Sequence, residues 1–166
     1  AHPRYAAMRE TIIPVLEAIK AQIAVLEQGL AALIAQSKTL VAKMEVLTSV
    51  KGVGKQTAYT LLAALPELGQ ITRRQVASLA GVAPHPRDSG SFRGYRKTMG
   101  GRGTVKRALF MAAMAARRFT PALRAFYERL ILNGKKKMVA LTAIMRKLIV
   151  ILNAKLRDLN MPLTTG

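Results

Sequence analysis

The stretch RDSGSFRGYRKTMGGRGTVKR, residues 87–107, separates two long apolar parts of the chain. It holds seven basic residues, one acidic residue, five glycines and two serines. Apolar residues at helical spacing flank it on both sides, so we expect helices before and after it. Between them we expect a loop, with at most a short hairpin in residues 90–100. The predicted fold class is therefore all-α.

The charge of this loop predicts that it binds an anion. Arg93, Arg96, Lys97 and Arg102 repel one another when no anion lies among them. The glycines let the backbone approach a bulky ligand, and arginine suits two-point contact with phosphate oxygens. We therefore predict a phosphate-binding surface, to which we also assign Arg87, Lys106 and Arg107.

The net charge of the whole chain also favours a polyanionic partner. The net charge is +19, from 27 Lys and Arg against 8 Asp and Glu. Residues 1–48 carry a net charge of +1 and residues 49–166 a net charge of +18. This concentration favours a nucleic-acid partner over a generally basic protein.

The composition also indicates in which cellular compartment the protein is found. There is no cysteine, which excludes disulfides and thiolate metal sites. Charged residues interrupt the apolar runs, and the N-terminus has no secretory signal. We expect a cytoplasmic protein with no membrane partner.

Upstream of the loop, LTSVKGVGKQTAYTLLAALPELG, residues 47–69, predicts a tight turn at Gly52-Val53-Gly54 and a helix over 55–65. Such a turn exposes backbone N–H groups and a helix N-terminus, which together suit an anion. Lys51 and Lys55 flank it. The spacing resembles the helix-hairpin-helix motif, which grips DNA phosphates without reading bases, and an ordinary glycine turn is the alternative.

The N-terminal part has a heptad pattern. Its apolar positions are Ile12, Leu16, Ile19, Ile23, Leu26, Leu30, Leu33, Leu40, Met44 and Leu47, with only Ser37 breaking the seam. The pattern predicts one long helix, starting near Thr11 or kinked at Pro14, that forms a two-stranded coiled coil in a homodimer. The alternative is a helix folded back on its own chain. We predict a dimerisation arm, residues 1–47, and a helical domain, residues 48–166.

Capping signals place the remaining helices. Thr72 and Gln75 form a capping box for a helix that ends at Gly81. A helix starts at Thr104, and another runs from Thr120-Pro121 to Asn133-Gly134. A last helix covers residues 136–159, with an apolar face of Val139, Ala143, Leu148, Ile151, Leu152 and Leu156.

Few residues could carry catalysis. The histidines are His2 and His85 alone, and the acids after residue 48 lie far apart in sequence. We therefore predict no metal or other cofactor site within this chain. A serine could attack a phosphodiester among arginines that stabilise phosphoryl charge. Ser89 and Ser91 are both candidates, although each is more often a turn hydroxyl.

Several motifs around the loop resemble a known family. They are Ala80-Gly81-Val82-Ala83-Pro84, Arg87-Asp88-Ser89-Gly90, Arg93-Gly94-Tyr95-Arg96 and Gly100-Gly101-Arg102, followed by an Arg-Ala-Leu helix. Together with PALRAFYERL, GKKKMVALTAIMRKLIVILNAKLRD and the GVG turn, they resemble the C-terminal domain of bridge-RNA-guided insertion-sequence transposases, the insertion-sequence one-hundred-and-ten family. The similarity covers about residues 47–159, and a coiled coil commonly precedes this domain in the family.

The resemblance implies a role in DNA recombination and transposition of a mobile element. Ser89 matches the serine that such proteins are thought to join to DNA, whereas Ser91 occupies a variable position. The resemblance also implies a guide RNA as a partner. The family's resolvase-like domain, with four metal-binding carboxylates, is missing from these 166 residues, so we expect a fragment or truncated copy that is inactive alone. Magnesium is expected only with that domain. The alternatives are a non-enzymatic, sequence-neutral helix-hairpin-helix protein and an RNA-binding module.

Overall fold

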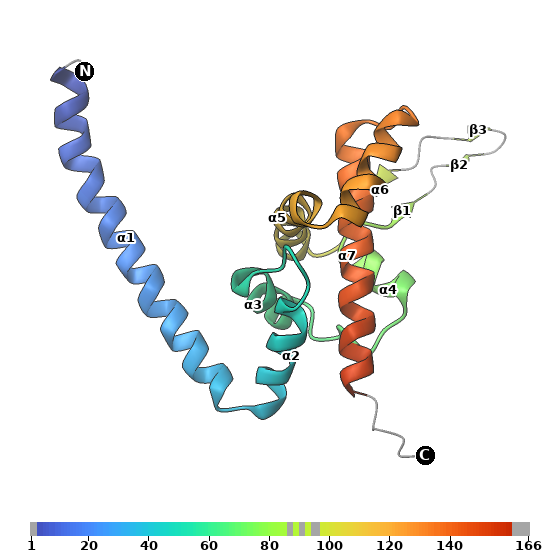
Figure 1. The fold of residues 1–166 in the computed structure, drawn as a ribbon, viewed down its shortest axis with the longest axis horizontal. Coiled ribbons are helices and arrows are strands. Elements are labelled where there is room, and N and C mark those ends of the chain that lie inside the picture. The colour runs from blue at the N-terminus through green and yellow to red at the C-terminus, as the bar shows by residue number, and fades with distance from the viewer. Residues whose placement is uncertain (1–2, 86–87, 90–91, 94–96, 161–166) are drawn as a thin grey trace. The chain divides into compact units, whose positions relative to one another are not determined.

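The computed structural model describes residues 3–85, 88–89, 92–93 and 97–160. The chain divides into two compact units, Ala1–Ala42 and Lys43–Gly166. Seven α-helices lie in the described residues, and the strands found there have two residues each and all lie between residues 84 and 98, which confirms the all-α class (Figure 1).

The first unit consists mainly of α1, Pro3–Ala35, which continues through Pro14. The expectation of one helix to residue 47 is wrong, because α1 ends before Ser37 and α2 spans Lys38–Thr48. Ser37 starts the new helix: its Oγ accepts a hydrogen bond from the Leu40 N–H at 3.4 Å, and its carbonyl accepts one from Val41 at 3.0 Å. The residue that interrupts the heptad seam therefore serves as the cap of α2.

The apolar stripe of α1 is exposed. Its large side chains from Ile12 to Leu33 are between 41% and 68% exposed. By length and composition, Met8–Ala35 could also cross a membrane, with a mean hydropathy of 1.4 over its most apolar window. Charged residues still interrupt this helix at Glu10, Glu17, Lys20 and Glu27, so the absence of a membrane partner stays a prediction.

The second unit is built around α7, Lys137–Asn160. This helix packs against α4, Arg73–Leu79, α5, Gly103–Phe119, and α6, Pro121–Leu132. The helix α3, Lys55–Ala64, packs against α5 (Figure 1). The bounds of α6 and α7 agree within about a residue with the predicted ones.

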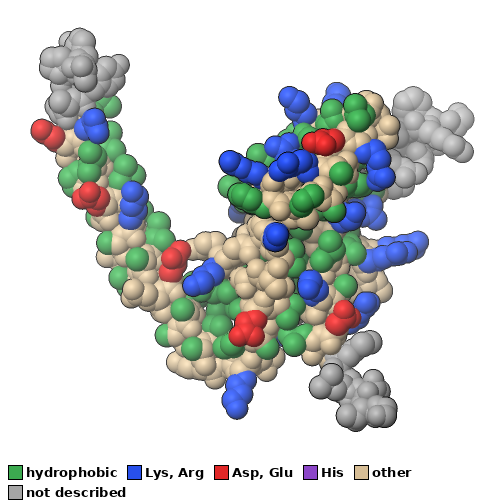
Figure 2. Space-filling view, viewed as in Figure 1, with side chains coloured by type: hydrophobic (Ala, Val, Ile, Leu, Met, Phe, Trp, Pro, Cys, Tyr) green, Lys and Arg blue, Asp and Glu red, His purple; other side chains and the backbone are tan. Residues whose placement is uncertain are grey.

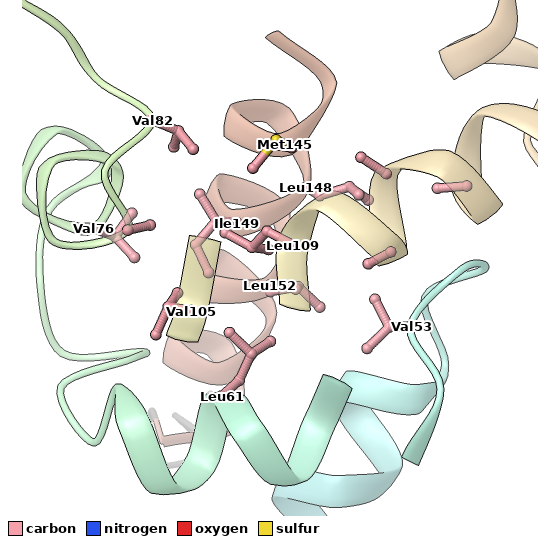
Figure 3. Close-up of a cluster of buried hydrophobic side chains, with 14 of the residues drawn as sticks. Val53, Leu61, Val76, Val82, Val105, Leu109, Met145, Leu148, Ile149 and Leu152 are labelled. Atoms are coloured by element: carbon pink, nitrogen blue, oxygen red, sulfur yellow. The ribbon is translucent and has the colours of Figure 1, made fainter. Parts of the chain in front are cut away.

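Figure 3 shows the core at the crossing of these helices. Val105 and Leu109 of α5 meet Ile149 and Leu152 of α7, with Leu61 of α3 beside them. Leu47 is also fully buried in this core, so its assignment to the exposed dimer seam is wrong.

The buried face of α7 differs from the predicted one. Leu148, Leu152 and Leu156 are buried as expected, but Val139 is exposed and Ala140, Ile144 and Ile149 are buried. Burial follows the i, i+4 and i+8 positions that face both α4 and α5, so the stripe is wider than the predicted one.

A buried amide fixes the connection between α3 and α4 to α7. Asn153 is 3% exposed. Its Oδ1 accepts a hydrogen bond from the Gly69 N–H at 2.9 Å, and its Nδ2 donates to the Ile71 carbonyl at 2.8 Å. Because both buried polar ends have partners, the amide holds this loop in one position.

Candidate nucleic-acid interface

The basic loop has its two ends held together by glycines. Gly81 follows α4 and has φ +66°, and Gly101 precedes α5 and has φ +78°. A Cβ on Gly101 would lie 2.8 Å from the Leu79 carbonyl and would also overlap the backbone of Gly81, and a Cβ on Gly81 would overlap the Gly100 carbonyl oxygen. The Arg102 N–H donates to Leu79 O at 2.7 Å. We call this contact the glycine clamp, Gly81 with Gly101; only glycine allows this approach.

Short strands continue from the clamp. Antiparallel pairing joins β1, Pro84–His85, to β4, Lys97–Thr98, and β2, Asp88–Ser89, to β3, Phe92–Arg93. Pairing begins at Pro84, outside the predicted range of 90–100. Ser89 is paired with Phe92, and Asp88 with Arg93. Of the predicted site, Ser89, Arg93 and Lys97 thus lie on one hairpin, whereas Arg87, Arg96 and the alternative Ser91 lie outside the described residues.

Arg102 anchors the base of this hairpin. Its Nη1 and Nη2 donate to the two carboxylate oxygens of Glu67 at 2.7 and 2.6 Å, and Nη1 also donates to the Ala64 carbonyl at 2.9 Å. The hydrogen bond from Arg102 lowers the pKa of Glu67 to about 2, with help from the backbone N–H of Glu67. The same bond raises the pKa of Arg102.

A phosphate would therefore have to compete with the Glu67 carboxylate for the guanidinium of Arg102, to which we had assigned a phosphate contact. Its guanidinium already has a bidentate carboxylate partner, and both side chains are a little over one-third exposed. Arg102 can position the hairpin against the C-terminal end of α3 without touching a ligand. No local sequence signal indicated this pair, because the two residues lie 35 positions apart.

The turn before α3 also depends on glycine. Gly52 has φ +96°, and a Cβ there would lie 2.5 Å from the backbone nitrogen of Ala116 in α5. Gly54 is exposed, has φ −87°, and has no atom within 4 Å of a Cβ position. Gly52 is therefore required by packing, whereas Gly54 begins α3 in open space without a side-chain cap. The helix-hairpin-helix assignment stays a prediction.

The predicted cations lie at two places. Lys51 and Lys55 are exposed beside the turn, and Arg107 is exposed just after the hairpin, with Lys106 half-buried. Gly52 meets α5 at Ala116, whereas the hairpin meets it near Gly103, about 20 Å away along the helix axis. The structure thus separates the turn from the hairpin.

The charged surface of the second unit is dominated by cations. Figure 2 shows Lys and Arg side chains spread over this unit with few acidic ones among them, whereas α1 carries both signs. Among the described residues, no group of three or more His, Asp or Glu could hold a metal ion.

The described residues thus form a helical domain with a short hairpin whose sequence is rich in Arg, Lys and Gly. The sequence model of the Transposase IS116/IS110/IS902 family matches residues 44–128, about half of the chain, and the chain belongs to this family. The matched range contains the glycine turn, the clamp and the hairpin.

Individual proteins with similar sequences support this family assignment. The chain is 40% identical over 115 residues to the insertion element IS110 uncharacterized 43.6 kDa protein of Streptomyces coelicolor, covering 68% of this chain and 28% of that protein. It is 33% identical over 121 residues to the pilin gene-inverting protein of Moraxella bovis, covering 70% and 37%. It is 34% identical over 85 residues to the insertion element IS900 uncharacterized 42 kDa protein of Mycobacterium paratuberculosis, covering 51% and 21%. The chain thus spans little more than a third of these relatives at most, and a transposition-related role follows from the family.

Proposed function

We propose that residues 43–166 form the DNA-binding domain of an insertion-sequence transposase, and that Ser89 is its nucleophile. The observation that carries this proposal is the clamped hairpin, which places Ser89 in a paired strand next to a cationic sequence. Family membership supports it, because a transposase must hold and exchange DNA strands.

The proposed step is a transesterification. Ser89 Oγ attacks the phosphorus of one phosphodiester, a serine–phosphate ester forms, and the bond to one sugar oxygen breaks. The serine proton passes to a base and the departing oxygen takes up a proton, so the number of phosphate esters is unchanged. Arg93 and the neighbouring cations stabilise the added negative charge on the phosphoryl oxygens. Serine is a weak nucleophile near neutral pH, so activation has to come from groups outside this domain.

The glycine turn supplies a second phosphate contact in this proposal. Lys51 and Lys55 are exposed on either side of the uncapped start of α3. Backbone N–H groups at such an end bind anions without regard to base sequence. This favours sequence-neutral binding of duplex or junction DNA. It also supports the second candidate function, a non-enzymatic DNA-binding protein in which Ser89 only forms part of a strand.

We further propose a cytoplasmic homodimer through the stripe of α1 from Ile12 to Leu33. The heptad positions of this stripe are 42–68% exposed, and a second copy of the helix would cover them: Ile12, Leu16, Ile19, Ile23, Leu26, Leu30 and Leu33. The family resemblance implies two further partners, which we include in this proposal. One is a guide RNA and the other is a carboxylate domain that binds magnesium.

The binding proposal is tested by fluorescence anisotropy with a duplex and a four-way junction at 50 to 200 mM KCl. If Lys51, Lys55, Arg87, Arg93, Arg96 and Lys97 each neutralise one phosphate, the logarithmic salt slope is about −5.4 and affinity falls roughly 1,800-fold over this range. Ser89→Ala should leave this binding unchanged. A flat salt response would refute electrostatic binding.

A further inference from the structure

A second basic surface lies on the C-terminal half of α5 and on α6, whereas the hairpin precedes the N-terminal end of α5. It is a groove of about 690 Å³ with apolar walls from Met111, Met114 and Phe119. Arg117, Arg118 and Arg124 bring three positive charges to the same groove, against the single acid Glu128. None of these arginines belongs to the phosphate surface that the loop sequence predicts.

Two guanidinium groups lie over aromatic rings in this groove. The Arg117 guanidinium lies 4.6 Å from the centre of the Tyr127 ring, and that of Arg118 lies 5.7 Å from the centre of the Phe119 ring. Phe119 is 60% exposed, so much of its side chain can contact a ligand in the groove. Its ring is open to a further planar group.

The backbone holds Phe119 in place. It is the last residue of α5, Thr120 donates its N–H to Ala116 O at 2.8 Å, and Pro121 begins α6. Arg124 crosses back to the end of α5, where its Nη2 donates to the Arg118 carbonyl at 2.6 Å. A guanidinium has five N–H donors, so Arg124 retains donors for a phosphate.

We propose that this groove binds an unpaired DNA strand, with a base stacked on Phe119 and phosphates held by Arg118 and Arg124. A duplex presents phosphates but keeps its base faces stacked inside, so only an unpaired base can use the Phe119 face. In a single strand each nucleotide has both a phosphate, which can bind an arginine, and an unpaired base, which can stack on the exposed ring. This rests on the proposed function, since strand exchange releases unpaired DNA next to the bound duplex.

The test compares binding of a fluorescent 12-nucleotide DNA, the same sequence as RNA, and a duplex, using the full chain. Phe119→Ala should weaken binding of the single strand by about five- to 150-fold and leave duplex binding unchanged. Leu132→Ala, which also removes an exposed apolar side chain but at the end of α6, is the matched control and should change neither. Circular dichroism checks that each variant is folded.

The arginines have their own matched control. Arg118→Ala combined with Arg124→Ala should reduce the salt slope of single-strand binding by about 1.4. Arg146→Ala with Lys155→Ala removes two exposed charges from α7 and should leave that slope unchanged.

The outcomes separate this proposal from the proposed function. If the chain binds a duplex but no single strand, or if single-strand binding survives Phe119→Ala, the single-strand proposal for the groove is refuted and the proposed function is not affected. Failure of the chain to bind any duplex or junction overturns the proposed function. Tighter binding of RNA than DNA, lost in Phe119→Ala, overturns the assignment to a DNA strand.

Discussion

The glycine clamp gives the sharpest prediction, a comparison of Gly101→Ala with Gly100→Ala. Both glycines have positive φ, +78° and +70°, so alanine is strained at either position, by about 1–2 kcal/mol. At Gly100 a Cβ has no atom within 4 Å, so this strain is the whole cost. At Gly101 the Cβ also meets the backbone of Gly81 and the Leu79 carbonyl, neither of which can rotate away. Overpacking of this kind adds about 1–3 kcal/mol.

We therefore expect the free energy of unfolding to fall by about 1–2 kcal/mol in Gly100→Ala and by about 2–5 kcal/mol in Gly101→Ala. Urea unfolding followed by circular dichroism at 222 nm measures both, and thermal melts should show the same order, with about 2–4 °C lost per kcal/mol. If the two variants lose equal stability, or Gly100→Ala loses more, the clamp does not hold the hairpin as described.

Three further predictions concern the pair at the hairpin base, the buried amide and the arm. Because the pKa of Glu67 is lowered from 4.5 to about 2, its bond to Arg102 adds stability above pH 4.5 that is lost as the pH falls toward 2. The stability difference between wild type and Glu67→Gln should shrink over that window in urea titrations; a constant difference would contradict the pairing. Asn153→Leu should lower the unfolding free energy by about 2–4 kcal/mol, because it leaves the buried Gly69 N–H and the half-buried Ile71 carbonyl without partners; a loss under 1 kcal/mol in urea unfolding would show that water replaces the amide. Leu26→Asp with Leu33→Asp should give monomers in sedimentation, and a double variant that remains dimeric would place the interface elsewhere.

Local signals in the sequence predicted most helix ends. Thr72 accepts a hydrogen bond from the Gln75 N–H, as the capping box requires, and α6 begins at the predicted Pro121. The end of α1 was missed because the heptad pattern continues across Ser37, and a serine in a helical run is ambiguous between an exposed polar position and a cap.

Contacts between distant residues explain what else the sequence could not predict. Gly52 was read as a phosphate-binding glycine, yet its neighbour is Ala116, 64 positions later. Arg102 was grouped with the cations around it, yet its partner is Glu67. The α5–α6 groove had a weak signal in Arg117-Arg118-Phe119, which precedes the start of α6, but only the fold brings Arg124 and Tyr127 beside them.

The role of Ser89 is tested most directly by trapping a covalent protein–DNA product. The chain is joined to the part of the Streptomyces coelicolor relative that it does not match and is incubated with magnesium and a nicked suicide substrate, and the products are run on a denaturing gel. We predict a covalent band that disappears in Ser89→Ala and persists in Ser91→Ala, and no band from the 166-residue chain alone. A band that survives Ser89→Ala, or one that is lost in Ser91→Ala instead, would contradict the assignment of Ser89 as the nucleophile.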